Sequence, residues 1–277
     1  EMKLGDNDRK YQPIVIRFLV QNGGSATRKE IEDEIDAVSF HYKPLQTTKN
    51  PFAILTDDFP VCGYDEPTET YSFGKDFDEY DEKEKAWIIV ECALKDETRK
   101  HALEEVVEKS KKVVSQLTNE RKEVLDRYGS GGKDDLTSEN LTAEQVVGFY
   151  NYKNNHHWKG LNQASGHIVK DMTTLRQYLK ILFDESRPIP ERIKQIRGEK
   201  KGDFSFYMLG QAIYTPLLLV ASDLKYAVIN SQVEEACDYL RLWPKQFQVK
   251  ASKPEEEWKI IPQMQEIVSE VANRYGL

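Results

Sequence analysis

A long stretch of helical periodicity in the middle of the chain constrains its fold most strongly. Between Leu103 and Tyr128 the apolar residues recur with a period of about 3.5, and most positions between them are charged. This pattern predicts one long helix with a narrow apolar seam, which is interrupted at Ser110 and Arg121. The glycine-rich residues 129–132 are expected to end the helix, and residues 133–140 are expected to form an exposed linker.

This helix divides the chain into three parts. We expect an amino-terminal domain over residues 1–75, a charged helical connector with its linker over residues 76–140, and a basic helical domain over residues 141–277. The apolar seam is long enough to pair with a second helix. It is therefore expected either to pack within the chain or to form a homodimer.

The amino-terminal part has the pattern of two short helices followed by a hairpin. Apolar residues recur at helical spacing over residues 8–21, and the string Asn22-Gly23-Gly24 is expected to end that helix. A capping box from Thr27 to Glu30 predicts the start of a second helix. Residues 59–64 and 70–73 favour strands, and the acidic, proline-containing segment between them favours a turn.

This order of elements resembles a winged-helix domain over residues 8–73. The resemblance implies a recognition helix in the DNA major groove and a hairpin wing on the backbone or in the minor groove. It also implies two kinds of contact with DNA. Phosphates would be contacted by Arg28 and Lys29, and base edges would be approached by Lys43, Lys49 and Asn50.

The chain departs from the winged-helix pattern in two places. Its wing turn carries Asp65, Glu66 and Glu69, which phosphate repels. The segment expected to supply the recognition helix contains Pro44 and Pro51, which helix interiors disfavour. Winged-helix folds also serve as protein–protein modules, so that alternative stays open.

The carboxy-terminal part is predicted to be helical with interruptions. Helices or buried elements are expected from Thr142, over 172–183, from Pro190, over 213–220, from a capping box of Ser231 with Glu234, and over 263–275. Residues 207–213 resemble a degenerate helix-hairpin-helix, in which backbone amides at a helix start face a phosphate. Met208 stands where the first glycine of that motif is expected, so an ordinary turn is the alternative.

Charge is distributed unevenly along the chain. The whole chain has a formal net charge of -8, whereas residues 150–213 carry 11 Lys and Arg against 6 Asp and Glu. An anionic partner such as a nucleic-acid backbone would be met by this basic segment. A solvated basic face without a ligand is the alternative.

Several strings of the carboxy-terminal half resemble a poorly characterised prokaryotic domain. They are HHWKGL (156–161), SGH (165–167), LFDES (182–186), IPERI (189–193), LGQAIYTPLL (209–218) and KYAVINS (225–231). We associate that domain with restriction-like proteins, including specificity regions beside methylation-dependent restriction motor ATPases. The resemblance implies binding of double-stranded DNA, with a restriction motor or nuclease subunit as a further partner. The positions that it implies for DNA contact are Lys159, His167, Lys170, Arg176, Gln211 and Asn230.

No catalytic or metal-binding motif is found in the sequence. The histidines His156, His157 and His167 have no carboxylate spacing that completes a familiar ligand set. The motifs GxSxG and HExxH and the Walker motif are absent. The sequence therefore predicts no catalytic residue, metal or cofactor, and it does not favour an enzyme.

The chain also lacks the sequence signals of a membrane or secreted protein. No apolar run approaches the roughly 20 residues that cross a bilayer, and the first residues form no hydrophobic signal segment. The cysteines Cys62, Cys92 and Cys237 are far apart, so neither a disulfide framework nor a cysteine zinc site is supported. We expect a cytoplasmic protein.

These patterns together predict a mainly α fold with a small β-hairpin wing. Its parts are a winged helix, a long connecting helix and a helical carboxy-terminal domain with a helix-hairpin-helix-like turn. The leading hypothesis is a DNA-binding recognition protein of a prokaryotic restriction or defence system, including one that reads modified DNA. The alternatives are a DNA-acting enzyme related to nucleases or glycosylases, and a dimeric winged-helix transcription regulator.

Overall fold

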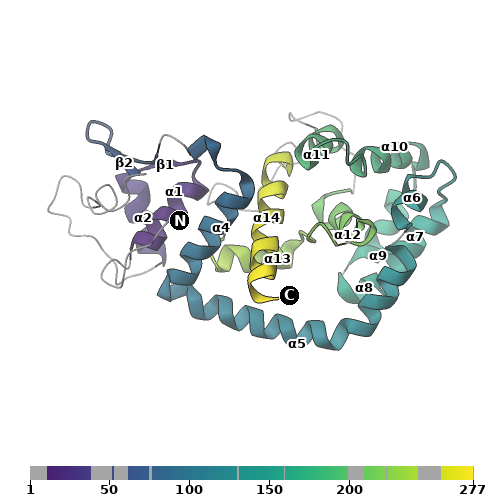
Figure 1. The fold of residues 1–277 in the computed structure, drawn as a ribbon. Coiled ribbons are helices and arrows are strands. Elements are labelled where there is room, and N and C mark those ends of the chain that lie inside the picture. Colours follow the sequence, from purple (N-terminus) through teal and green to yellow (C-terminus); the bar gives the residue numbers. More distant parts are fainter. Residues whose placement is uncertain are drawn as a thin grey trace. The chain divides into compact units, whose positions relative to one another are not determined.

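The computed structural model of the protein describes residues 11–38, 52, 62–74, 77–129, 131–158, 160–198, 209–222, 224–242 and 257–276. Over these ranges the fold is mainly helical, with one small three-stranded antiparallel sheet (Figure 1). The predicted combination of a mainly α fold with a β-hairpin is confirmed at this level. The same ranges contain no helix that is long and apolar enough to span a membrane.

The chain forms two compact units. Unit 1 comprises residues 1–109, 236–248 and 270–276, and unit 2 comprises residues 110–235, 249–269 and 277. Three helices contribute residues to both units. They are α5 (Glu97–Tyr128), α13 (Ser231–Tyr239) and α14 (Glu257–Tyr275).

Unit 1 is built around a helix that is buried on every side. All ten residues of α1 (Gln12–Gln21) are buried, in agreement with the helix predicted over residues 8–21. The guanidinium of Arg17 lies 3.4 Å from the carboxylates of both Glu34 and Asp96, so its charge is balanced inside the core. The elements packed against α1 are β1 (Ser25–Thr27), α2 (Arg28–Val38), β3 (Thr70–Phe73) and α4 (Glu82–Lys95).

The sheet of unit 1 has the strand order β1-β3-β2. β2 (Cys62–Asp65) and β3 form the predicted hairpin, in which Tyr64 lies opposite Tyr71. The sequence does not predict β1, which pairs antiparallel with β3 and places Ala26 opposite Tyr71. A strand of three residues is too short to show the alternation that distinguishes a strand from a loop.

The predicted capping box at the start of α2 is present. The hydroxyl of Thr27 accepts a hydrogen bond from the amide of Glu30 at 3.3 Å, and the carboxylate of Glu30 accepts one from the amide of Thr27 at 2.8 Å. Since these bonds satisfy donors that a helix start leaves free, they fix where α2 begins.

The long central helix is confirmed as α5, but the linker expected after it is corrected. Leu103, Val107 and Val124 of the apolar seam are buried, whereas Val113 is 50% exposed. After α5 the chain forms α6 (Gly132–Thr137), whose Leu136 is buried. A single apolar side chain in this polar run docks the short helix. Composition alone does not predict that this side chain is buried.

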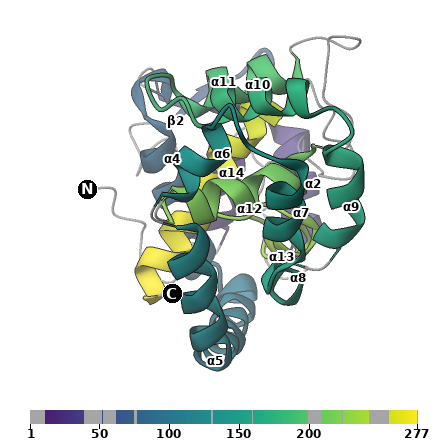
Figure 2. The ribbon, with the colours of Figure 1, turned by 90° about the vertical axis from the view of Figure 1, so that its right-hand side faces the viewer.

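Unit 2 is a set of short helices around α12 (Gln211–Ala221), as Figure 2 shows. The predicted capping box of Thr142 with Gln145 starts one of these helices, and Pro190 lies in the first turn of another. The buried run of residues 213–220 is helical although Pro216 lies within it. The other helices of the unit are α7 (Ala143–Asn151), α8 (Asn154–His157), α9 (Leu161–Ile168), α10 (Met172–Leu182) and α11 (Ile189–Arg197).

Gly24 offers a test of the packing in unit 1. It has a φ of +91°, and a Cβ added to it would lie 2.6 Å from the ring of Phe77 in the 3-10 helix η1 (Phe77–Glu79). We expect Gly24→Ala to lower the free energy of unfolding by about 2–4 kcal/mol in urea denaturation, because backbone strain and a clash add.

Gly23 supplies the matched control, since its φ is +73° and a Cβ there would meet no atom within 4 Å. Gly23→Ala should therefore cost only the backbone strain, about 1 kcal/mol. Equal losses in the two variants would mean that the Phe77 ring moves aside freely.

Candidate functional site

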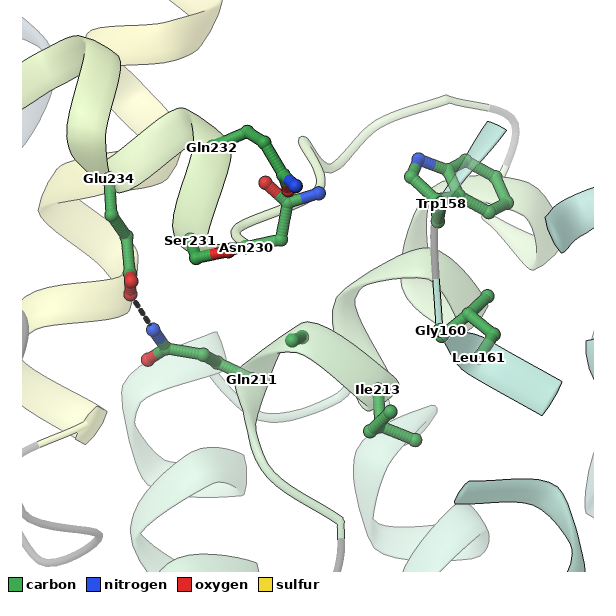
Figure 3. A pocket seen from close by; sticks show the side chains of 10 residues that line it. Trp158, Gly160, Leu161, Gln211, Ile213, Asn230, Ser231, Gln232 and Glu234 are labelled. Carbon is green, nitrogen blue, oxygen red and sulfur yellow. Dashed lines mark hydrogen bonds between the residues drawn. The ribbon is translucent and has the colours of Figure 1, made fainter. Parts of the chain in front are cut away.

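Three chain segments of unit 2 meet around a pocket with a volume of about 310 Å³ (Figure 3). They are the connection between α8 and α9, the first turn of α12 and the start of α13. The volume lies at the lower end of the range of about 300–1,000 Å³ that is typical of ligand pockets. The lining residues are Trp158, Gly160, Leu161, Gln211, Ala212, Ile213, Asn230, Ser231, Gln232 and Glu234.

The two sides of the pocket differ in chemistry. Figure 3 shows Trp158 and Leu161 on one side, and the polar side chains of Gln211, Asn230 and Glu234 on the other. Trp158, Gln211 and Asn230 are each partly exposed, so the pocket is open to solvent. The site thus presents an aromatic surface opposite a set of hydrogen-bonding groups.

Asn230 has a fixed orientation because it caps α13. Its Oδ1 accepts a hydrogen bond from the amide of Val233 at 3.1 Å. This corrects the predicted cap, which placed the capping side chain one residue later, at Ser231. With Oδ1 held by the cap, the Nδ2 group remains to donate, and Figure 3 shows it directed toward the Trp158 side of the pocket.

Gln211 and Glu234 join the first turn of α12 to α13. The Nε2 group of Gln211 donates a hydrogen bond to Oε1 of Glu234. Burial raises the pKa of Glu234 to about 7, and the charge of Glu257 acts in the same direction. Near neutral pH this carboxyl group is therefore protonated in a substantial fraction of molecules, and the pocket carries little charge.

A buried ion pair supports the first turn of α12. Nη2 of Arg197 lies 2.9 Å from one carboxylate oxygen of Glu257, and Nε lies 3.0 Å from the other. The hydroxyl of Tyr214, which is fully buried in α12, donates to the same carboxylate at 3.2 Å. These bonds hold the segment that carries Gln211.

A second set of hydrogen bonds fixes the distance between the two polar segments of the pocket. The hydroxyl of Thr215 donates to the carbonyl of Gln211 at 2.7 Å and accepts from the amide of Ile229 at 2.9 Å. Because Ile229 precedes Asn230, this hydroxyl couples the first turn of α12 to the cap of α13. Pocket residues from two distant parts of the sequence are thereby brought together.

The structure places the predicted contact residues of the carboxy-terminal half in different surroundings. Gln211 and Asn230 line the pocket. Arg176 instead donates two hydrogen bonds to the carbonyl of Leu141, at 3.1 and 2.8 Å. His167 and Lys170 are exposed neighbours on the surface, with their nitrogen atoms 3.2 Å apart.

The predicted contact residues of the amino-terminal half are separated in the same way. Arg28 is paired with Glu32 at 2.9 Å and lies 3.8 Å from Glu69 of the hairpin turn. Lys29 is exposed. The remaining predicted positions, namely Lys43, Lys49, Asn50 and Lys159, lie outside the described residues.

Several of the described cations of the basic segment have partners inside the protein. Carboxylates from outside residues 150–213 bind several of them, so counting charges within the segment overstates the free positive charge. The pairs are Lys153 with Glu123, Lys180 with Glu139, and Arg197 with Glu257. Arg187 pairs with Asp184, and the buried Arg192 donates to the carbonyl of Leu182 and to the hydroxyl of Tyr226.

Sequence reasoning missed three side chains of the pocket. Glu234 was expected only as part of a capping box, and Trp158 and Gln232 were not chosen as contact residues. The string HHWKGL already contains Trp158, but the sequence does not reveal that this residue faces α13. Within the described part of the chain, no group of three or more His, Cys, Asp or Glu side chains could hold a metal ion.

Comparison of the chain with family models, curated proteins and solved structures gave no match.

The raised pKa of Glu234 predicts a pH-dependent stability. Because the folded state holds this proton more tightly than the unfolded chain, whose pKa is near 4.5, stability should fall as the pH rises from about 4.5 through 7. Glu234→Gln removes the charge that is costly to bury. The melting temperature of this variant minus that of the wild type should be larger at pH 8 than at pH 5.

Asp238→Asn is the control, since Asp238 is an exposed carboxylate on α13 whose charge does not act on Glu234. A difference in melting temperature that stays constant between pH 5 and pH 8 for Glu234→Gln would contradict the assignment of a buried, proton-holding carboxyl group.

Proposed function

We propose that the protein recognises DNA and that the pocket of unit 2 takes part in the readout. The observation that carries this proposal is the pairing of an indole, Trp158, with three carboxamides, those of Gln211, Asn230 and Gln232. A carboxamide donates and accepts hydrogen bonds at once, which is why Asn and Gln are used to read base edges. An indole face stacks on any base.

Unit 1 is proposed to contribute contacts to the backbone. Its order of helix, strand, helix and hairpin supports the winged-helix assignment. The exposed Lys29 at the start of α2 is the proposed phosphate contact, whereas Arg28 is already engaged by Glu32. Asp65 at the end of β2 and Glu66 in the hairpin turn disfavour a wing that lies close to phosphate.

In the proposed function, the protein is the recognition component of an assembly that also contains a motor or nuclease subunit. This part of the proposal rests on the resemblance to restriction-associated domains. Base readout by the protein would then determine where the partner acts.

Binding of the full chain to labelled DNA, followed by fluorescence anisotropy, tests the proposal. Plain and methylated duplexes, single strands and RNA should be compared over a range of salt concentrations. The logarithm of affinity falls by about 0.9 per neutralised phosphate for each tenfold rise in salt. Because several cations of the basic segment are paired with carboxylates, we expect duplex binding with a slope of about -1 to -4. Absence of binding to every nucleic acid at low salt would overturn the proposal.

One observation favours an enzyme as the second candidate. A carboxyl group whose pKa lies near neutrality inside a pocket is suited to hold and release a proton, and Glu234 has this property. The same duplexes therefore need to be examined for strand cleavage and base release. Either product with the wild type, but not with Glu234→Gln, would support this candidate.

Lys29 tests the role of unit 1. We expect Lys29→Ala to weaken binding to all duplexes by a similar factor and to reduce the salt slope by about one, because a phosphate contact carries no sequence information. Lys100→Ala changes the net charge equally at an exposed position on α5 and serves as the control. Equal losses in the two variants would show that only the net charge matters.

A further inference from the structure

We propose that the pocket of unit 2 binds a single nucleobase that has left the base stack, with the face of the base against Trp158 and a hydrogen-bond acceptor of its edge on Nδ2 of Asn230. This inference rests on the proposed recognition of DNA. It goes further by naming what enters the pocket and how the ligand is oriented.

The concave shape of the site is the first argument. Bases inside a duplex are reached by elements that protrude into a groove, such as a helix. A pocket of about 310 Å³ does the opposite, since it receives a group that protrudes from its partner. A duplex offers its bases to such a site only when one nucleotide turns out of the helix.

The second argument is the fixed donor at the start of α13. Because the amide of Val233 holds Oδ1 of Asn230, the carboxamide cannot exchange its donor and acceptor ends without losing the cap. Its Nδ2 group can therefore donate to an acceptor of the ligand. Every base has such an acceptor, either a ring nitrogen or a carbonyl oxygen, on its edge. Gln232, whose carboxamide extends toward the same side in Figure 3, can rotate to match the neighbouring group of the base.

The third argument is the electrostatic character of the pocket. The described residues that line it include no Lys, Arg or His, and they include the carboxyl group of Glu234. A phosphate would meet no described cation in this lining, whereas a neutral base needs none. The aromatic surface of Trp158, which also presents its indole nitrogen toward the polar side in Figure 3, suits a flat ring.

Mismatched duplexes test this inference without knowledge of a preferred sequence. Turning a base out costs less at a mismatch than at a matched pair. We expect the full-length protein to bind a duplex with one central mismatch about tenfold more tightly than the matched duplex. It should also prefer the mismatch to a duplex with abasic sites on both strands at that position, which is flexible but offers no base.

Three variants separate the contacts. Trp158→Ala should bring the ratio of mismatched to matched affinity close to one, whereas Trp158→Phe keeps an aromatic face and most of the ratio. Asn230→Asp should also lose the ratio, because aspartate still caps α13 but has no amide donor. Each readout is the ratio of mismatched to matched affinity for one variant. A uniform effect of the charge added by Asn230→Asp therefore cancels. Unchanged melting temperatures exclude misfolding as the cause.

The outcomes distinguish the two proposals. If the wild type binds duplex DNA but treats matched, mismatched and double-abasic duplexes alike, the base pocket is overturned and DNA recognition stands. If it prefers the double-abasic duplex as much as the mismatch, it reads flexibility, and the pocket inference fails. Absence of binding to any nucleic acid overturns both proposals.

Discussion

The hydroxyl of Thr215 is the interaction on which the candidate site depends. It joins the carbonyl of Gln211 to the amide of Ile229, and so places the first turn of α12 beside the cap of α13. The buried pair of Arg197 with Glu257 holds the same turn through the hydroxyl of Tyr214. Breaking one partner of such a buried pair typically costs about 3–5 kcal/mol, because the remaining charge is left without compensation. The Thr215 hydroxyl and the ion pair of Arg197 with Glu257 lie outside the pocket lining, yet the shape of the pocket depends on them.

Local signals in the sequence predicted much of the fold. The capping boxes at Thr27 and Thr142 and the periodic seam of α5 depend only on neighbours along the chain, and all three are present. The elements that were missed depend on distant partners. β1 exists because β3 pairs with it, and α6 is ordered because Leu136 is buried in unit 2. Winged-helix and helix-hairpin-helix topology stay predictions.

Only part of the candidate site could be predicted, because charge and capping were judged locally. Gln211 and Asn230 were chosen from a family resemblance, and the structure brings them together in one pocket. Arg176 was chosen on the same basis but is bound to the carbonyl of Leu141. The carboxylates that neutralise the basic segment come from α5, from the segment before α7 and from α14. No count within residues 150–213 includes them. In the proposed mode of binding, a nearly neutral pocket reads the base, and surface charge has only a minor role.

The most direct test of this account follows the indole signals of the tryptophans by NMR while duplex DNA with a central mismatch is added. The chain has four tryptophans, and the signal of Trp158 can be assigned from its absence in Trp158→Phe. The account predicts that this signal shifts or broadens strongly, while that of Trp258 on α14 changes little. A complex in which DNA is bound but the Trp158 signal stays unchanged would contradict the central claim.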